Sequence, residues 1–270
     1  MYSDAHCHPF DLLDRMDEAG LAQGLKEVAC AASSSDREQF EFNAALAEKA
    51  ASRGDPPLVL CFAVHPQYPA AVPGDEPSIR GELLPLLETL ASGKRLNAIG
   101  EAGFDLYNDD FKNTEEIQDE IFNHHLEIAL NYDLPMVIHC RRAMHKIFFH
   151  EKKLRRVPAL VFHSWSGTMG EGEALLRRGI NAYFSFGAAV YNNHRQAQKC
   201  CALLPAERIL LETDAPFVPP RGKEFSSWAD LGLICETAAN LRKEAGSPGA
   251  YPEEMEALST ENFFRAFSKQ

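Results

Sequence analysis

The sequence lacks several features that would assign it to a specialised class of protein. No uninterrupted apolar stretch approaches the roughly 20 residues that a membrane-spanning helix needs. The acidic N-terminus lacks the basic and apolar regions of a signal peptide. The seven cysteines show no C-x-x-C spacing, and such an odd, scattered set is not a disulfide framework. We therefore expect a cytoplasmic protein in a reducing compartment, with no membrane contact.

Positive charge is also scarce, since the formal net charge is −12 at pH 7. An acidic surface repels nucleic acid unless basic groups are concentrated locally. Such a concentration exists, because residues 141–156 include seven Lys or Arg and only one acidic residue, Glu151. Nucleic acid is therefore not excluded as a partner. Nothing in the sequence indicates an obligate protein partner.

No linker, repeat or low-complexity segment interrupts the 270 residues, of which 45% are hydrophobic and 24% charged. We therefore expect one domain over residues 1–270. Eight short apolar runs begin at Ser3, Leu25, Leu58, Asn97, Leu134, Pro158, Asn181 and Ile209. Helical patterns lie between and after them, at 36–52, 79–91, 115–131, 195–204, 229–245 and 253–267.

This alternation predicts parallel strands joined by right-handed crossovers, and eight such units predict a closed (β/α)₈ TIM barrel. A doubly wound open sheet is the main alternative. No glycine-rich phosphate loop of the G-x-G-x-x-G or G-x-x-x-x-G-K type follows any of the apolar runs, which argues against that alternative. The fold class is therefore α/β, with the barrel favoured.

Reactive groups of such a barrel lie at the carboxyl ends of the strands. Here those ends carry histidines and carboxylates: His6, His8, His65, Glu101, His139, His163 and Asp214. Because strand side chains alternate, His6 and His8 share one face and Cys7 points to the other. The same argument turns Cys140 away from His139, so both cysteines are expected to pack against helices.

Neutral imidazole and ionised carboxylate are ligands that suit zinc, manganese, nickel or iron. A single histidine at a strand end is more often a hydrogen-bonded structural residue than a ligand. Even without His65, polar candidates at five different strand ends favour a metal site instead. Four histidines and two carboxylates exceed one tetrahedral site, so two metals that share a carboxylate fit the count.

Six motifs in order resemble those of the TatD-like metal-dependent hydrolases, often called TatD-family deoxyribonucleases, within the amidohydrolase superfamily. They are DAHCH, GEAGFD, QDEIFNHHLEIALNYDLPMVIHCRRA, FHSWSG, LLETDAPFVPP and ENFFRAF, and they span nearly the whole chain. The resemblance implies that His6, His8 and Asp214 hold one divalent ion. It likewise implies that His139 and His163 hold a second ion, and that Glu101 bridges the two.

Two stretches depart from the family pattern. The third-strand motif often contains a second histidine, and here AVHPQ retains His65 and has Gln67 instead. The Arg-Gly-Lys of the last loop is usually followed by asparagine, glutamate and proline, and here by EFSS. Neither departure touches a proposed metal ligand.

The expected cofactors are two divalent metal ions, which could be zinc, magnesium or manganese. The expected reaction is hydrolysis of DNA phosphodiesters by a metal-bound hydroxide, acting 3'-5' on single-stranded DNA or 3' ends. Asp214 is expected to orient the water and shuttle its proton, with Glu101 as the second catalytic residue. His65, Arg141 and Arg221 are expected to bind the phosphoryl oxygens.

Further residues are expected to support the site or to lie near it. Asp4 and Glu212 lie deeper and either orient ligating imidazoles or serve as buried anchors. Arg142 is expected to contact substrate, whereas Lys152, Lys153, Arg155 and Arg156 are expected on a solvated outer helix. Trp165 either stacks a terminal base or forms a wall of the pocket.

Two other functions remain open from the sequence. The same metals could serve hydrolysis of an amide, ester or lactone, which the wider superfamily resemblance embraces. A non-catalytic barrel could instead act as a binding module, although all six expected ligand positions are filled.

Overall fold

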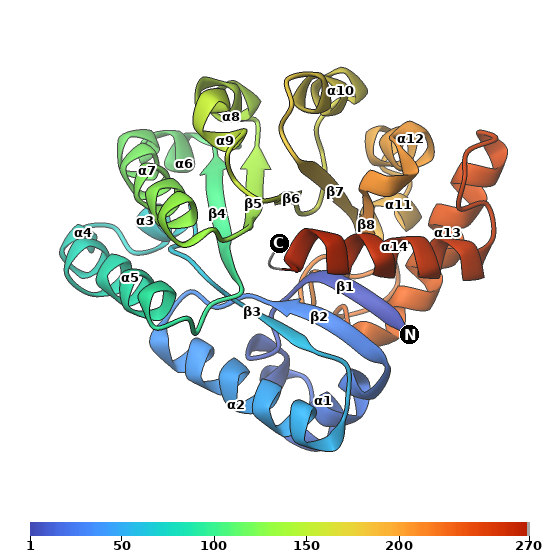
Figure 1. The fold of residues 1–270 in the computed structure, drawn as a ribbon, viewed down its shortest axis with the longest axis horizontal. Helices are drawn as coiled ribbons and strands as arrows, with labels where there is room; N and C mark the ends of the chain where they lie inside the picture. The colour runs from blue at the N-terminus through green and yellow to red at the C-terminus, as the bar shows by residue number, and fades with distance from the viewer. Residues whose placement is uncertain (269–270) are drawn as a thin grey trace.

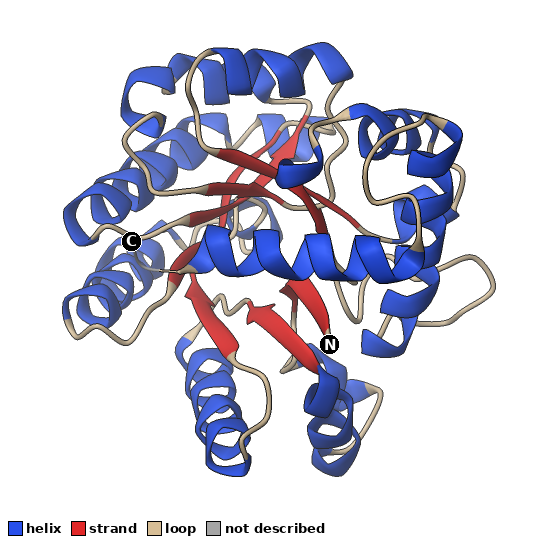
Figure 2. Cartoon of the chain, turned by 45° about the vertical axis from the view of Figure 1, so that its right-hand side comes forward, coloured by secondary structure: helices blue, strands red, loops and turns tan. Residues whose placement is uncertain are grey.

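Eight parallel strands in chain order form one sheet, which a ring of helices surrounds (Figures 1 and 2). The structure is a computed structural model and describes residues 1–268. Each strand pairs with the next in parallel register, which confirms the predicted barrel architecture. The strands are β1 (Tyr2–Cys7), β2 (Val28–Ala32), β3 (Leu58–Phe62), β4 (Ala98–Asp105), β5 (Met136–Arg141), β6 (Leu160–Phe162), β7 (Ala182–Phe186) and β8 (Ile209–Leu211).

The first strand is joined to the segment that follows the last strand. The His8 N–H donates to the Ala215 carbonyl at 2.7 Å, and the Asp214 N–H donates to the His6 carbonyl at 3.0 Å. These two bonds bring the start and the end of the sheet together. They also place Asp214 directly beside His6 and His8.

The helices predicted from sequence are present, and several short ones accompany them. Four of the six expected ranges match α2 (Arg37–Arg53), α7 (Glu115–Tyr132), α12 (Arg195–Leu203) and α14 (Pro252–Phe267). The other two match α5 (Leu84–Ser92) and α13 (Leu231–Glu244). A π-helical turn (Ile79–Leu83) precedes α5, and a 3-10 turn (Trp228–Asp230) precedes α13. The remaining helices are α1 (Glu18–Gly24), α3 (Tyr68–Ala71), α4 (Glu76–Ser78), α6 (Asp109–Lys112), α8 (Met144–Phe149), α9 (Glu151–Leu154), α10 (Met169–Arg177) and α11 (Ala188–Tyr191).

Local sequence explains where the helices begin and end. The Asp36 carboxylate accepts the Gln39 N–H at 2.9 Å and so caps α2, which ends at the left-handed Gly54. Thr168 and Glu171 form a capping box at the start of α10. Within residues 1–268, no helix is long and apolar enough to cross a membrane. All seven cysteines are free thiols, as expected, while the cytoplasmic location stays a prediction.

Two apolar clusters make up most of the core. The larger lies between the sheet and the outer helices, and includes Phe62, Phe104, Phe122 and Phe162. The second receives side chains from all eight strands and therefore fills the inside of the barrel: Ala5, Ala29, Ala31, Val59, Cys61, Ala98, Val137, Val161, Tyr183 and Leu210. Many of these residues are small, which leaves room for an insertion from outside the sheet.

Helix α14 supplies that insertion. It lies against β1 and β8 (Figure 1), and its Phe263, Ala266 and Phe267 join the interior cluster. Its polar residues contact the first residues of β1 and β8. Ser259 Oγ lies 3.4 Å from Ser3 Oγ, and the Asn262 amide donates to the Ile209 carbonyl at 2.9 Å. Helix α14 therefore closes the amino end of the barrel and leaves the carboxyl end for the functional site.

Strand β1 does not alternate regularly. Ala5 belongs to the barrel interior, whereas Cys7 packs outside with Leu12, Leu21 and Trp228. Simple alternation would place Ala5 and Cys7 on one face, but the β1–β2 register shifts between Asp4 and Cys7. The expected helix-facing position of Cys7 is therefore confirmed, although an irregular strand produces it.

Candidate metal centre

Glycines of β4 let this strand approach β5 closely enough to build the site. Gly103 has φ +142°, and a Cβ atom there would lie 2.0 Å from the His139 carbonyl oxygen. A Cβ atom at Gly100 would lie 2.6 Å from the Val137 Cβ. Only glycine tolerates these approaches. The close strands place Glu101 beside His139.

Glu101 lies at the centre of a cluster of imidazoles. Its Oε1 is 2.6 Å from His139 Nδ1 and 2.6 Å from His163 Nε2. Its Oε2 is 3.2 Å from His6 Nε2 and 3.8 Å from His8 Nε2. The two oxygens of one buried carboxylate therefore face two separate groups of nitrogen atoms.

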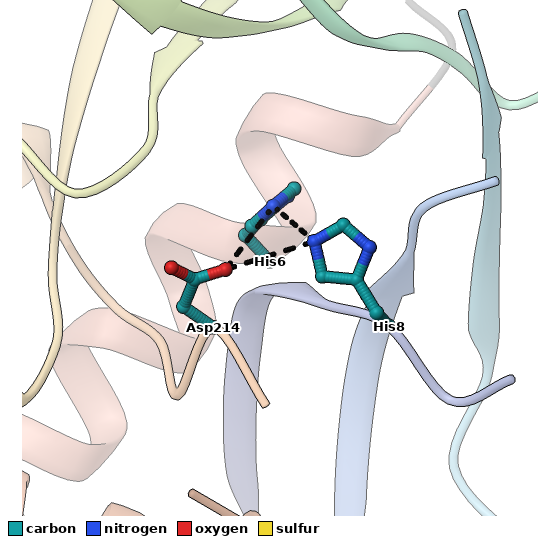
Figure 3. Close-up of side chains that lie close together, drawn as sticks. All are labelled: His6, His8 and Asp214. Atoms are coloured by element: carbon teal, nitrogen blue, oxygen red, sulfur yellow. Dashed lines mark hydrogen bonds and ion pairs between the residues drawn. The ribbon is translucent and has the colours of Figure 1, made fainter. Parts of the chain in front are cut away.

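The nitrogens that face Glu101 Oε2 belong to His6 and His8, and Asp214 completes this first group of possible ligands (Figure 3). The Nε2 atoms of the two histidines are 3.0 Å apart, and each lies 3.6 Å from Asp214 Oδ1. Figure 3 shows the second oxygen of Asp214 directed away from both imidazoles. Asp214 has the left-handed φ of 54°, uncommon for a non-glycine residue, and its N–H bond to His6 helps to hold it there.

The opposite ring nitrogens of the histidines also have polar neighbours. His139 Nε2 is 2.9 Å from Asp105 Oδ2, and His6 Nδ1 is 3.2 Å from Ser33 Oγ. Such partners orient ligating imidazoles and fix which nitrogen carries the proton. A proton on His139 Nε2, held by the Asp105 carboxylate, leaves the Nδ1 lone pair directed at Glu101.

His65 carries its proton on the same ring nitrogen as His139 but turns the other side of the ring toward Glu101. Its Nδ1 accepts the Gln67 N–H at 3.1 Å, so a neutral ring carries its proton on Nε2. That Nε2 lies 3.2 Å from Glu101 Oε1 and can donate to it. This arrangement separates His65, as a hydrogen-bond donor, from the histidines whose lone pairs face Glu101.

Charge holds the cluster together. Burial alone would raise the pKa of Glu101, but the imidazoles of His163, His65 and His6 outweigh it and hold that pKa well below its usual value. Burial opposes protonation of His163, yet Glu101 and Glu212 raise its pKa well above its usual value. The pKa of Asp214 is likewise lowered, because nearby imidazoles overcome its burial. Both carboxylates are therefore ionised, which metal binding requires.

The two deeper acids differ in what they contact. Glu212 accepts the Ser164 N–H at 2.7 Å and lies 3.7 Å from His163 Nδ1, beside an imidazole. Asp4 instead accepts the Thr213 N–H at 2.9 Å and the Thr213 hydroxyl at 2.6 Å. Burial raises the pKa of Asp4 to about 7. Of the two interpretations of Asp4, the buried anchor fits these contacts better.

The cluster opens into a cavity of about 640 Å³ at the carboxyl end of the barrel. Its wall includes His65, Arg141 and Trp165. Trp165 is only 3% exposed and packs edge-on against Phe162 and Phe184, so it forms a wall. Arg142 and Arg221 are absent from the described wall, and the Arg221 N–H is bonded to Asn192 Oδ1 at 2.8 Å. A role for Arg221 stays a prediction.

Sequence reasoning missed Asp105, although this residue ends the motif GEAGFD. Asp105 is fully buried, and its Oδ2 also accepts the Gln67 amide at 2.7 Å and lies 3.6 Å from Arg141 Nη1. A carboxylate that ends a strand beside a proposed ligand was the available signal. Its partners could not be found from sequence, because Gln67 follows β3 whereas His139 and Arg141 belong to the end of β5.

The donor set fits a divalent cation. Three sets of three donor atoms each lie within 4.8 Å of one another: His6, His8 and Asp214; His6, Glu101 and His163; His65, Glu101 and His139. His139 Nδ1 and His163 Nε2 approach to 3.2 Å, much as the Nε2 atoms of the first group do. Such crowded lone pairs need a proton or a cation between them. The buried carboxylates favour the cation.

A parallel eight-stranded barrel with imidazole and carboxylate donors at the carboxyl ends of its strands defines a class, the metal-dependent hydrolase barrels. Sequence comparison then gives the family. The profile of the TatD related DNases matches residues 3–268, so the chain belongs to that family. The resemblance seen in the six motifs is thereby confirmed.

Curated relatives carry the name 3'-5' ssDNA/RNA exonuclease TatD. The protein from Cronobacter sakazakii is 31% identical over 210 residues, which cover 76% of this chain and 75% of that protein. The protein from Erwinia tasmaniensis is 34% identical over 163 residues, 58% of this chain and 62% of that protein. The match to the Escherichia fergusonii protein, at 37% identity, covers 49% of this chain and 50% of that protein.

Solved structures share the fold. YjjV, a TatD homologue from Escherichia coli K12, superposes with a TM-score of 0.80 at 24% identity, covering 98% of this chain and 97% of that one. A TatD family hydrolase from Entamoeba histolytica gives 0.74 at 16% identity, covering 100% and 98%. At these identities the likeness supports the barrel alone.

Proposed function

We propose that the chain is a divalent-metal-dependent phosphodiesterase that trims single-stranded DNA from its 3' end. The observation that carries the proposal is the position of Glu101, whose two oxygens face separate groups of imidazoles. The names of the curated exonucleases support the choice of nucleic acid and of direction.

The proposed ligands fall into two sets that share Glu101. His6, His8 and Asp214, whose donor atoms lie within 4.8 Å of one another, would hold one ion. His139 and His163, whose facing nitrogens are 3.2 Å apart, would hold the other. When bound, divalent cations supply Lewis acidity toward a phosphoryl oxygen and lower the pKa of water. Asp214 would accept the proton of the attacking water on the oxygen that faces away from the two imidazoles in Figure 3.

Two further side chains of the cavity wall would bind the substrate. Arg141 lines the cavity and presents a guanidinium, which matches phosphoryl oxygens in charge and geometry. His65 donates from Nε2 and is 24% exposed in its side chain, so that proton can reach either Glu101 or a substrate oxygen. The buried ring of Trp165 forms another part of the cavity wall.

The proposal is tested with protein stripped by a chelator and reloaded separately with manganese, magnesium or zinc. The substrate is a single-stranded DNA oligonucleotide labelled at its 5' end, with RNA, duplex DNA, amides and lactones in parallel reactions. We expect metal-dependent shortening of the single strand from its 3' end. A Glu48→Gln variant, changed on the outer face of α2, is the matched control for Glu101→Gln.

The alternatives predict different results. Turnover of amides or lactones alone would replace the nuclease with another hydrolase. A protein that binds no manganese, magnesium or zinc by elemental analysis and hydrolyses none of the substrates would be a binding module. Shortening from the 5' end would keep the reaction and overturn the proposed direction.

A further inference from the structure

An aromatic residue and two arginines form a compact group beside the cavity. The Arg141 Cζ lies 4.3 Å from the centroid of the Tyr107 ring, and the Arg142 Cζ lies 4.5 Å from the same centroid. Arg142 Nη1 also donates to the Tyr107 carbonyl at 3.2 Å. Tyr107 is 46% exposed. One ring therefore positions two guanidinium groups at the surface.

The group is anchored to the candidate metal centre through Asp105. Asp105 Oδ1 accepts the Tyr107 N–H at 2.9 Å. Its Oδ2 lies 3.6 Å from Arg141 Nη1 and 2.9 Å from His139 Nε2. A buried carboxylate thus fixes the position of the surface group relative to a proposed metal ligand.

The positive charge of the group is largely uncompensated, unlike that of other basic residues nearby in sequence. Lys146 pairs with Glu115 and Asp119, and Lys153 and Arg155 also face glutamates. Arg142 has no ion pair among residues 1–268, and Arg141 approaches only Asp105, which His139 shares. The acidic Asp109, which follows Tyr107 closely, is paired with Lys112 at 2.9 Å.

We propose that Tyr107, Arg141 and Arg142, here named the phosphate clamp, bind the backbone phosphate next to the one being cleaved. The inference rests on the proposed nuclease function and specifies its substrate as a polynucleotide with at least two consecutive phosphates. Under this proposal, the uncleaved strand leaves the cavity over the clamp.

The positions of the three residues relative to the cavity support this assignment. Arg141 lines the cavity wall, whereas Arg142 and Tyr107 lie outside the described wall and continue it outward. Arg142 commits one N–H to the Tyr107 carbonyl and has four others to offer. Arg141 can therefore contact the phosphate inside the cavity, and Arg142 with the Tyr107 hydroxyl the phosphate beyond it.

Binding without turnover tests the clamp directly. Fluorescence anisotropy is measured in EDTA with labelled oligothymidylates of two, four and eight nucleotides, for the wild type, Arg142→Ala and Tyr107→Ala. The matched control is Arg156→Ala, which removes the same charge from an exposed residue shortly before β6, at the opposite end of the barrel.

We expect wild-type affinity to rise from the dinucleotide to the tetranucleotide. Arg142→Ala should weaken tetranucleotide binding about tenfold and remove most of that rise. It should also reduce the slope of log K against log salt by about 0.7, the value for one phosphate contact on a single strand. Arg142→Lys should restore the salt slope and only part of the affinity. Arg156→Ala should match the wild type.

The failure of the clamp is distinguishable from that of the nuclease. If metal-loaded wild type shortens oligonucleotides but Arg142→Ala and Arg156→Ala bind every length equally well, the clamp is wrong and the nuclease stands. If the wild type neither binds nor shortens oligonucleotides, the proposed function fails, and the clamp with it. Should Arg142→Ala misfold by circular dichroism, Arg142→Gln and Tyr107→Leu give the same comparison.

Discussion

The two ends of the barrel are built from the same eight strands and differ in almost everything else. At the amino end, α14 inserts Phe263 and Phe267 among small interior side chains. At the carboxyl end, Glu101 and the imidazoles around it line an open cavity. The comparison teaches that one end of the sheet supplies stability, while the other accepts unfavourable burial of charge for chemistry.

Burial has opposite consequences at the two ends. Removing Phe263 from water is favourable, because apolar burial drives folding. Burying the carboxylate of Glu101 is unfavourable unless partners compensate it, and its partners are themselves buried imidazoles. Substitutions at the amino end should therefore change stability, and substitutions at the carboxyl end should change activity and metal binding.

The largest expected effect is at the centre of the carboxyl end. Glu101→Gln removes the charge that both groups of imidazoles face, so kcat/KM for a single-stranded oligonucleotide should fall about 10⁴-fold, or ~5.5 kcal/mol. Glu48→Gln should keep wild-type activity. If the kcat/KM of Glu101→Gln remains within tenfold of the wild-type value in steady-state assays, the proposed division between a stabilising end and a catalytic end is wrong.

The next effect is at the amino end and concerns stability. Phe263→Ala leaves a cavity inside the barrel and should lower the free energy of unfolding by about 4 kcal/mol. The half-buried neighbour Phe264 is the matched control, and Phe264→Ala should cost less than half as much. Urea denaturation provides both values. The kcat of folded Phe263→Ala at 25 °C should be unchanged, and a large fall in kcat would show that the two ends are coupled.

Metal removal compares the two ends in one experiment. An ion at a hundred times its dissociation constant should stabilise the folded chain by ~2.7 kcal/mol. For a chain of this size, that corresponds to a rise in Tm of about 5–10 °C. Calorimetry with and without EDTA should give equal shifts for the wild type and Phe263→Ala, because distant sites add. Glu101→Gln should lose most of the shift, and an undiminished shift there would place the ion elsewhere.

A smaller effect is expected from Asp105, which supports the site without facing Glu101. Asp105→Asn weakens the hold on the Nε2 proton of His139, so metal affinity should fall about 10- to 100-fold. Competition with a chelating dye gives this value without an activity assay. Asp133→Asn, at the exposed end of α7, is the control. Unchanged affinity in Asp105→Asn would remove Asp105 from the metal centre and leave it as the anchor of Tyr107.

The sequence predicted the barrel and the members of the central cluster because both depend on repeated patterns. Strand alternation and strand ends are short-range features, and His6, His8 and His139 each follow from them. The same features do not determine side-chain pairing across strands. The irregularity of β1, which separates Ala5 from Cys7, arises from register and has no local signal.

The residues that sequence reasoning missed depend on such long-range pairing. Gln67 was noted only as a departure from the family pattern, yet its amide donates to Asp105 Oδ2 at 2.7 Å. Tyr107 belongs to none of the six motifs, and its proposed role in the phosphate clamp follows from the two arginines that approach its ring. Both residues lie in loops, whose path over the barrel rim the strand pattern leaves open.

The smallest expected effect concerns Arg221, which the sequence grouped with Arg141. The loop after β8 exposes Arg221 and bonds its backbone N–H to Asn192 Oδ1, and Arg221 is not part of the described cavity wall, whereas Arg141 is. Arg141→Ala should raise KM for a tetranucleotide about 10- to 100-fold, because a charge-assisted bond is lost. Arg221→Ala should change KM less than about twofold, as surface substitutions usually do.

Steady-state kinetics with a tetranucleotide and a 20-nucleotide strand show whether Arg221 contacts substrate at all. A rise in KM for Arg221→Ala that is confined to the longer strand would show that the substrate-binding surface at the carboxyl end of the barrel reaches this loop.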